Sequence, residues 1–405
     1  MLRLIKKYSL DESLFFALGA FSFSVVFSVS AVEAALFLAL GLLIAKKRRE
    51  NTLDAVKPAL TGHPLFLPWL VYLGVCLLTA LTAYYPLKGL GQLNSDFLRY
   101  LCLSTLLLAV KKAHLPGLSA VYTLAAFSAA VIGITEATCT TASRADAFMN
   151  AVRYSEVLII ALALILSRLI IPVKESFPRE QLFYKLAAMP VFISILLAQT
   201  RSSYLGVIIC VMTMLYFARP SRKRMAAYAA IMAVTGTLVV TNNPAMVNRL
   251  SAMANTKKGD FSANSPSTGI NTRLELWKLG LKMVKAHPVL GVGPDNIKKV
   301  FKKFQPEQIG AEETWGSLHN LYVHQAAERG LLGLGALLLL FAAMFIFALK
   351  RFRAARSPYT LWPLCALPAF FTMNLTEISF QHVHPAFAIL LALAFSAAAE
   401  EERSG

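Results

Sequence analysis

Long apolar runs recur along the chain and are separated by short polar or basic segments. Runs such as AVYTLAAFSAAVIGI at 120–134 are apolar on every side. A barrel strand would alternate in polarity and a soluble surface helix would be apolar on one stripe, so neither matches this pattern. A helix satisfies its own backbone hydrogen bonds in lipid. The pattern therefore predicts an all-α integral membrane protein.

About twelve transmembrane helices are expected, because a helix needs roughly 20 mostly apolar residues to cross the hydrocarbon layer of a bilayer. The expected spans are 13–29, 31–45, 64–83, 97–110, 115–134, 152–171, 186–199, 203–218, 226–241, 331–349, 359–375 and 385–399. A long polar segment interrupts this series between the ninth and tenth spans. We therefore expect three regions: nine spans in 1–241, a large helical loop domain in 242–330, and three spans with a tail in 331–405.

Lysine and arginine residues outside the long loop fall mostly on alternate connections between the spans. Short cytoplasmic loops retain such residues, so this pattern sets the orientation of the chain. It predicts cytoplasmic N- and C-termini and an extracytoplasmic segment 242–330. The main clusters on the cytoplasmic side are Lys6–Lys7, Lys46–Arg49, Lys111–Lys112, Arg222–Arg224 and Lys350–Arg351.

The composition agrees with a membrane protein, since 57% of the residues are hydrophobic, 15% are charged and the mean hydropathy is +0.57. The net charge of +18 is explained by the orientation and by contact with anionic lipid headgroups. A nucleic-acid partner is not required. The cysteines include no C-x-x-C pair, and no two histidines have the spacing of metal ligands on one helical face. Neither a metal nor another cofactor is expected.

Two amphipathic helices are expected in the long loop, after a Ser-, Asn-, Gly- and Thr-rich linker at 250–271. The first helix is capped by Asn271 or Thr272 and ends at His287. Its apolar face carries Leu274, Trp277, Leu281 and Val284. The second helix carries Ile297, Val300, Phe301 and Phe304 on one face, and Lys298, Lys299, Lys302 and Lys303 on the other. Both helices are expected to lie on the membrane with their apolar faces toward lipid.

Two arginines on the extracytoplasmic side are candidate ligands for a polyanion. Arg201, in A-Q-T-R-S-S-Y-L-G, lies in a turn between two apolar helices, where a guanidinium can face the bundle interior and bind phosphate through two hydrogen bonds. Arg273 opens the first loop helix in N-T-R-L-E-L-W, where Glu275 is an alternative partner. Two arginines on the same side of the membrane would suit a pyrophosphate.

His319, in W-G-S-L-H-N-L-Y, is the candidate base, because an imidazole can accept a proton near neutral pH. Asn320 offers an amide beside it, and His324 is the main competitor. The spans carry almost no ionisable residue well inside an apolar run, whereas ion-coupled transporters usually place such groups at mid-membrane. Transport is therefore disfavoured. The histidines with weaker cases are His63, His114, His287, His382 and His384.

Three motifs resemble the O-antigen ligase family, within a wider group that includes O-antigen polymerases and protein O-oligosaccharyltransferases. They are Q-T-R-S at Arg201, T-R-L-E-L-W with the following G-L-x-M and H-P-x-x-G-x-G from Arg273 to Gly293, and L-H-N at His319. The resemblance extends to the layout of nearly the whole chain, since that family also has twelve spans and one large periplasmic loop late in the sequence.

The resemblance implies a multi-pass protein of the Gram-negative inner membrane, with a GT-C-like glycosyltransferase fold and an active site facing the periplasm. The implied reaction is the metal-independent, inverting transfer of a polysaccharide from undecaprenyl pyrophosphate to the lipid A-core oligosaccharide. By the same resemblance, Arg201 and Arg273 would hold the diphosphate, and His319 would be the essential catalytic residue.

Further residues are expected to line the same cavity or to bind the phosphates and acidic sugars of the acceptor. They are Asn320, His324, Trp277, Lys88, Arg153, Lys298, Lys299, Lys302 and Lys303. Two alternative functions stay open at this point. An O-antigen polymerase or a protein O-oligosaccharyltransferase would share the fold and the donor but use another acceptor. A small-solute membrane transporter would belong to a different class.

Overall fold

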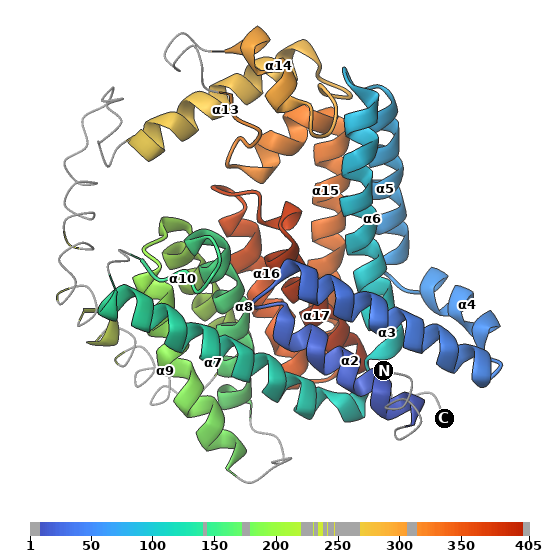
Figure 1. The fold of residues 1–405 in the computed structure, drawn as a ribbon, viewed down its shortest axis with the longest axis vertical. Helices are drawn as coiled ribbons and strands as arrows, with labels where there is room; N and C mark the ends of the chain where they lie inside the picture. The colour runs from blue at the N-terminus through green and yellow to red at the C-terminus, as the bar shows by residue number, and fades with distance from the viewer. Residues whose placement is uncertain are drawn as a thin grey trace.

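The computed structural model describes residues 9–140, 144–171, 179–219, 230, 234–237, 241, 247, 268–305 and 314–399. Across these residues the chain forms helices and turns and contains no strand, which confirms the prediction of an all-α protein (Figure 1). The helices are α2 (Leu10–Ser24), α3 (Val29–Arg49), α4 (Val56–Thr61), α5 (Phe66–Leu81), α6 (Pro86–Ala109), α7 (Leu115–Cys139), α8 (Ala151–Ile170), α9 (Glu180–Leu197), α10 (Arg201–Ala218), α13 (Thr268–Ala286), α14 (Ile297–Phe304), α15 (Leu321–Ala354), α16 (Pro358–Met373) and α17 (Val383–Ala398), with a 3₁₀ turn, η3, at Ser379–Gln381.

The main bundle surrounds helices α8, α16 and α17, which are buried on nearly every side (Figure 1). Helices α5 and α6 run beside α15 on one flank, and α7, α9 and α10 lie on the other. Helices that are apolar all round are stable only in such an interior or in lipid. Helices α13 and α14 lie beyond one end of the bundle, which we call the site end; the other end is called the opposite end.

The number of membrane spans stays a prediction. Five described helices are long and apolar enough to cross a bilayer: Val29–Arg49, Lys112–Cys139, Glu180–Leu197, Arg201–Ala218 and Leu321–Ala354. The pair Leu53–Thr61 and Phe66–Leu81, bent by 83°, would add a sixth. Other helices at the predicted spans are shorter or carry more charge. The predicted ninth span, 226–241, and the linker, 250–271, lie almost entirely outside the described residues.

A second hydrophobic core, separate from the bundle core, holds the two helices of the long loop. It contains Leu276, Leu279, Met283, Val292, Ile297, Val300, Phe301, Leu318 and Ala327. The prediction that the apolar face of α14 lies toward lipid is therefore wrong, since that face packs against protein. Apolar area buried in this way is worth about 25 cal/mol per Å².

Helix α13 also differs from its prediction in both its start and its buried face. It begins at Thr268, before the predicted caps Asn271 and Thr272. Leu274 and Leu281 of the predicted apolar face are exposed, whereas the second core takes the neighbouring face of the helix. Both faces have apolar residues at helical spacing, and packing against α14 and α15 decides between them.

Helix α15 changes direction at Gly330, where φ is 66° and ψ is −173°. A Cβ atom at Gly330 would lie 2.0 Å from the carbonyl oxygen of Val289, so only glycine fits this left-handed position. Beside the break, the Gly293 amide donates to the carbonyl oxygen of Glu328 at 2.8 Å. The H-P-x-x-G-x-G motif therefore forms a turn that packs against the break in α15.

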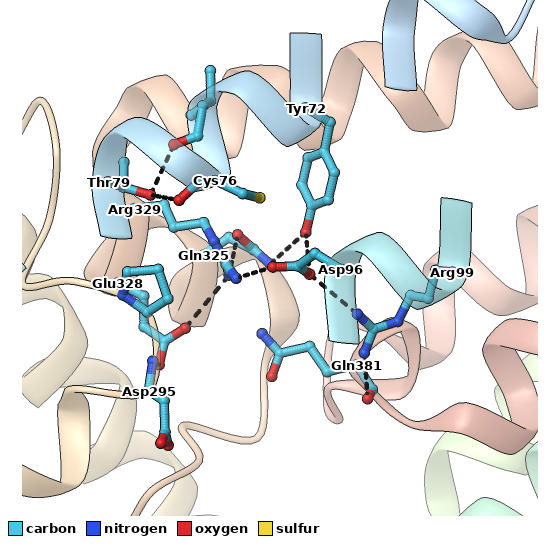
Figure 2. Close-up of polar contacts among 12 residues, drawn as sticks. Tyr72, Cys76, Thr79, Asp96, Arg99, Asp295, Gln325, Glu328, Arg329 and Gln381 are labelled. Atoms are coloured by element: carbon cyan, nitrogen blue, oxygen red, sulfur yellow. Dashed lines mark hydrogen bonds and ion pairs between the residues drawn. The ribbon is translucent and has the colours of Figure 1, made fainter. Parts of the chain in front are cut away.

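The bundle contains a buried charged network at the level of α5, α6 and α15 (Figure 2). Asp96 accepts hydrogen bonds from Arg99 at 3.1 Å and from Arg329 at 2.7 Å. Glu156 and Arg168 are also buried within a predicted span. All of these residues lie within five residues of the end of a predicted span or just outside one, so they do not contradict the expectation that almost no ionisable residue lies well inside an apolar run. Asp96 is doubly paired with cations, which offsets the cost of burying its charge.

Several of the predicted cytoplasmic basic clusters come together at the opposite end. Lys46 and Lys111 both pair with Asp11, and Arg356 donates to the carbonyl oxygen of Phe217 at 3.3 Å. The first of these contacts joins the ends of α3 and α2. The two lysines, acting through hydrogen bonds, lower the pKa of Asp11 to about 2. Residues of three predicted clusters thus make contacts at this end of the bundle, and the side of the membrane that this end faces stays a prediction.

Candidate functional site

Glu377, which follows α16, is the centre of the candidate site because it binds two of the three residues singled out from the sequence. One carboxylate oxygen pairs with the Arg273 guanidinium, and the other lies 3.1 Å from Nδ1 of His319. The Glu377 side chain is only 7% exposed, while those of Arg273 and His319 are 31% and 28% exposed. The carboxylate is therefore buried behind an arginine and a histidine that a ligand can reach.

The backbone around His319 fixes the position of this ring. His319 adopts a left-handed conformation with φ 48°, and its amide donates to the Ser317 hydroxyl at 3.1 Å. The next residue, Asn320, caps α15 by accepting hydrogen bonds from two backbone amides at 3.0 and 3.1 Å. The Leu321 amide then donates to the carbonyl oxygens of Asn374 and Glu377 at 2.9 and 3.0 Å. The L-H-N motif is thus bonded directly to the turn that carries Glu377.

Arg201 is the first residue of α10, at the site end of the bundle. The preceding Thr200 lies in a hydroxyl cluster with Ser155 and Ser203, with oxygen–oxygen distances of 2.6 to 2.8 Å. Ser155 belongs to α8, and the next α8 residue, Glu156, accepts a hydrogen bond from Ser379 at 2.6 Å. The turns that carry Arg201 and Glu377 therefore contact adjacent residues of α8.

His382 lies in the same turn region as Glu377 and is largely buried. Burial lowers the pKa of His382 to about 3, and the positive charges of Arg153 and Arg99 act in the same direction, as does His319. The ring is therefore neutral near pH 7. Its Nδ1 has no hydrogen-bond partner within the described part of the chain. A neutral imidazole with an unused nitrogen accordingly lies close enough to the candidate base His319 for the charge of that ring to affect its pKa.

The buried network holds this turn from the other side (Figure 2). Arg99, which is paired with Asp96, donates from Nη2 to the carbonyl oxygen of Gln381 at 2.6 Å. Glu328 accepts a hydrogen bond from the Asp295 amide at 2.8 Å and pairs with Arg329 at 3.5 Å. The network thus joins the segment 374–382 to α6, to α15 and to the turn that follows α13.

The remaining predicted residues occupy several different environments. His324 is buried and pairs with Glu328 at 3.3 Å, away from Glu377. Lys88 pairs with Asp295 at 3.3 Å on the surface, and Arg153 is exposed but close enough to His382 to affect its pKa. Trp277 is half-buried. The exposed lysines of α14 are Lys298, Lys299, Lys302 and Lys303, of which Lys303 lies 4.7 Å from the ring centre of Tyr84.

Sequence reasoning missed Glu377 and Glu156 and ranked His382 among the weaker histidine candidates. A signal was available for two of them, because T-E-I-S-F-Q-H-V-H is a polar stretch between two apolar runs on the same predicted side as His319. Glu156 gave no signal of its own, since a single acid near the start of an apolar run is ordinary. Within the described residues, no group of three His, Cys, Asp or Glu side chains is arranged to hold a metal ion.

Comparison with known proteins bears directly on this region. Residues 186–338 match the family described as O-antigen ligase. This segment is therefore similar to the O-antigen ligase family. An uncharacterised protein of Haemophilus influenzae is 23% identical over 181 residues, an alignment that covers 42% of this chain and 44% of the relative. The apolar helices and the family together indicate a multi-pass membrane protein.

The O-antigen ligase match contains three of the residues discussed above, Arg201, Arg273 and His319, and ends before Glu377. It begins within α9 and ends within α15. The partner of both Arg273 and His319 is therefore supplied by a part of the chain that lies outside the matched region.

Proposed function

We propose that this protein is an O-antigen ligase, which transfers a polysaccharide from undecaprenyl pyrophosphate to the lipid A-core oligosaccharide on the periplasmic side of the inner membrane. The observation that carries the proposal is the group of Arg273, Glu377 and His319, because two of these residues lie in the part of the chain that matches the family. The same group offers a base and a cation within reach of one ligand.

In the proposed reaction, His319 is the general base. Its Nδ1 faces the Glu377 carboxylate, which favours the tautomer with the proton on Nδ1 and leaves the Nε2 lone pair for the acceptor. The acceptor hydroxyl gives its proton to Nε2 as its oxygen bonds to the anomeric carbon. The bond from that carbon to the diphosphate oxygen breaks on the opposite face, so the anomeric configuration is inverted.

In this proposal, Arg201 and Arg273 bind the diphosphate and stabilise the negative charge that develops on it as it leaves. Arg273 uses Nη2 for Glu377, and the rest of its partly exposed guanidinium remains for phosphate oxygens. Fixed donors aimed at developing charge are worth about 10²- to 10³-fold in rate each. We propose that the reaction is metal-independent, with the two arginines supplying the charge stabilisation.

The deciding experiment is a transfer assay with the purified full chain, undecaprenyl pyrophosphate-linked glycan and rough lipopolysaccharide. We expect glycan-modified lipopolysaccharide with the wild type, and a loss of roughly 100-fold or more in Arg273→Ala and His319→Ala. Lys282→Ala is a matched control, because Lys282 is an exposed cation on the same helix as Arg273. No transfer by the folded wild type would overturn the proposal.

A gene deletion separates the ligase from the polymerase of the same group. Loss of the ligase should remove all polysaccharide from lipid A-core, so that only rough lipopolysaccharide is seen on a gel. Retention of a band with a single repeat unit would indicate a polymerase instead. Unchanged long-chain bands in the deletion strain would contradict both assignments and favour another acceptor, such as a protein.

A further inference from the structure

A cavity of about 710 Å³ lies at the opposite end of the bundle, among α3, α4, α6, α15 and α17. It is lined by four basic residues: Lys47, His63, Lys350 and Arg351. On α15 it lies near Lys350, whereas the candidate site lies beside Leu321. At 1.5 Å per residue, the part of α15 from the break at Gly330 to Lys350 alone spans about 30 Å. The cavity is therefore independent of the proposed transfer site.

The described residues that line the cavity carry a net positive charge, because they include no aspartate or glutamate. Lys46, the neighbour of Lys47, pairs with both Asp11 and Glu50. By contrast, neither Lys47 nor Lys350 forms an ion pair with any carboxylate in the described part of the chain. Two cations at the rim of one cavity without an acidic partner favour an anionic ligand.

His63 adds a hydrogen-bond donor to this lining rather than a fourth full charge. Its Nδ1 accepts a hydrogen bond from the Leu65 amide at 3.2 Å, so the ring proton lies on Nε2. That Nε2 is buried and has no partner among the described residues. Burial lowers the pKa of His63 to about 4, with Arg351 acting in the same direction. The ring is therefore neutral at pH 7 and has an unused donor.

Arg351 is held in place by the end of α17, since it donates to the carbonyl oxygens of Ser396 at 3.2 Å and of Ala397. This leaves Lys47 and Lys350 as the adaptable cations of the cavity. Lysine carries a compact point charge on a flexible stem, so it can reach a phosphate from the wall of the cavity. The charge pattern alone would accept inorganic phosphate as well as a lipid phosphate.

The apolar part of the lining favours a lipid over free phosphate. It is formed mainly by Leu107, Leu108, Ala343, Ile346 and Phe347. Helix α4 forms one edge of the cavity and has no buried residue, and α4–α5 is the pair bent by 83°. An exposed short helix bent away from a membrane bundle is typical of the lipid–water interface. An acyl chain can therefore follow the apolar wall while its phosphate meets the lysines.

We propose that this cavity is a binding site for an anionic phospholipid. Lys47 and Lys350 contact the headgroup phosphate, His63 donates to one of the lipid oxygens, and the acyl chain lies along Leu107 and Phe347. Basic pockets between membrane helices bind anionic headgroups in this manner. A bound lipid would join the ends of α3, α15 and α17, which contribute the charged and apolar walls.

The test uses the full chain purified in mild detergent, with phosphatidylglycerol as the probe. Native mass spectrometry counts retained lipids, and the thermal unfolding midpoint reports stabilisation. We expect tight retention of phosphatidylglycerol by the wild type, and roughly tenfold to thirtyfold weaker binding in Lys47→Ala/Lys350→Ala. Arg49→Ala/Lys57→Ala is the matched control: both residues are exposed, lie at the same end and are absent from the lining.

Three outcomes would overturn this proposal. The first is equal retention of phosphatidylglycerol by the cavity variant and the control variant. The second is equal stabilisation by zwitterionic phosphatidylcholine, which would show that charge is not recognised. The third is equal stabilisation by millimolar inorganic phosphate, which would make the apolar wall irrelevant. Transfer activity is not part of this readout, so failure of the proposed function would leave the lipid test intact.

Discussion

Nδ1 of His319 lies 3.1 Å from Oε2 of Glu377, although 58 residues separate them in the chain. The carboxylate fixes the ring orientation and would stabilise an imidazolium formed during transfer. Glu377→Gln keeps the shape of the side chain but removes its charge. We expect kcat to fall by about 10²-fold, with a smaller change in the KM for acceptor.

A conservative variant distinguishes this positioning role from a merely structural one. Glu377→Asp keeps the charge on a shorter side chain, so it should recover part of the kcat that Glu377→Gln loses. A Glu377→Gln variant that folds normally and keeps the kcat of the wild type would contradict the role of Glu377.

Arg201 and Arg273 are expected to act on the same diphosphate. Arg201→Lys and Arg273→Lys retain the charge but lose the planar pair of donors, so each should lower kcat/KM for the donor by roughly tenfold to a hundredfold. The effects of the double variant should be non-additive, because both side chains bind one group. Steady-state kinetics at varied donor concentration provide the measurement. Strictly additive losses would indicate two separate sites.

The helical architecture could be predicted because the hydrophobic pattern depends on neighbouring residues. Arg273 and His319 could be picked out as candidates, since both belong to motifs of contiguous residues, and in the folded chain both contact Glu377. Their common partner could not. Glu377 and Arg273 are 104 residues apart, and only the folded chain brings them together. Nothing in the local sequence around Glu377 specifies that contact.

The buried face of α13 illustrates a second limit. Leu274 and Leu281 have the same seven-residue spacing as Leu276 and Met283, so periodicity alone cannot choose between the two faces. The choice follows from the position of α14, whose apolar face must also be covered. The burial of charges near the ends of predicted spans shows the same limit. A cation such as Arg329 can be buried only when an acid from another helix approaches it.

The ion pair between Arg329 and Asp96 is fully buried and should be essential for stability. Arg329→Met leaves the Asp96 charge less well paired, so we expect a loss of about 3 to 5 kcal/mol in the free energy of unfolding. The combination Arg329→Met/Asp96→Asn should cost less than the sum of the single changes. Lys88→Ala, which removes an exposed pair with Asp295, should cost about 1 kcal/mol or less. Thermal unfolding in detergent measures the double variant and the single variants Arg329→Met, Asp96→Asn and Lys88→Ala. Equal losses of stability at the buried and the exposed ion pair would contradict this account.

His382 should make stability depend on pH. Its pKa is about 3 in the folded protein and close to 6.5 when unfolded, so between these values the unfolded chain binds the additional proton. Stability is therefore complete above about pH 6.5 and decreases as the pH falls toward 3. At pH 5 the loss is about 2 kcal/mol. In His382→Gln, the unfolding midpoint should depend less on pH over this window; an unchanged slope would exclude His382 as its source.

Gly330 should be the glycine of α15 that is least tolerant of substitution. In Gly330→Ala, the new methyl group would meet the carbonyl oxygen of Val289 and the residue would have to keep a positive φ. Either α15 straightens or the turn at 287–293 moves, and both changes would displace the segment that carries Arg273.

Gly335→Ala is the control, because nothing lies within 4 Å of its added methyl group and alanine favours a helix by about 1 kcal/mol. We expect Gly330→Ala to lower the unfolding midpoint and transfer activity, and Gly335→Ala to match or exceed the wild type. Equal behaviour of the two variants would show that the break in α15 does not depend on glycine.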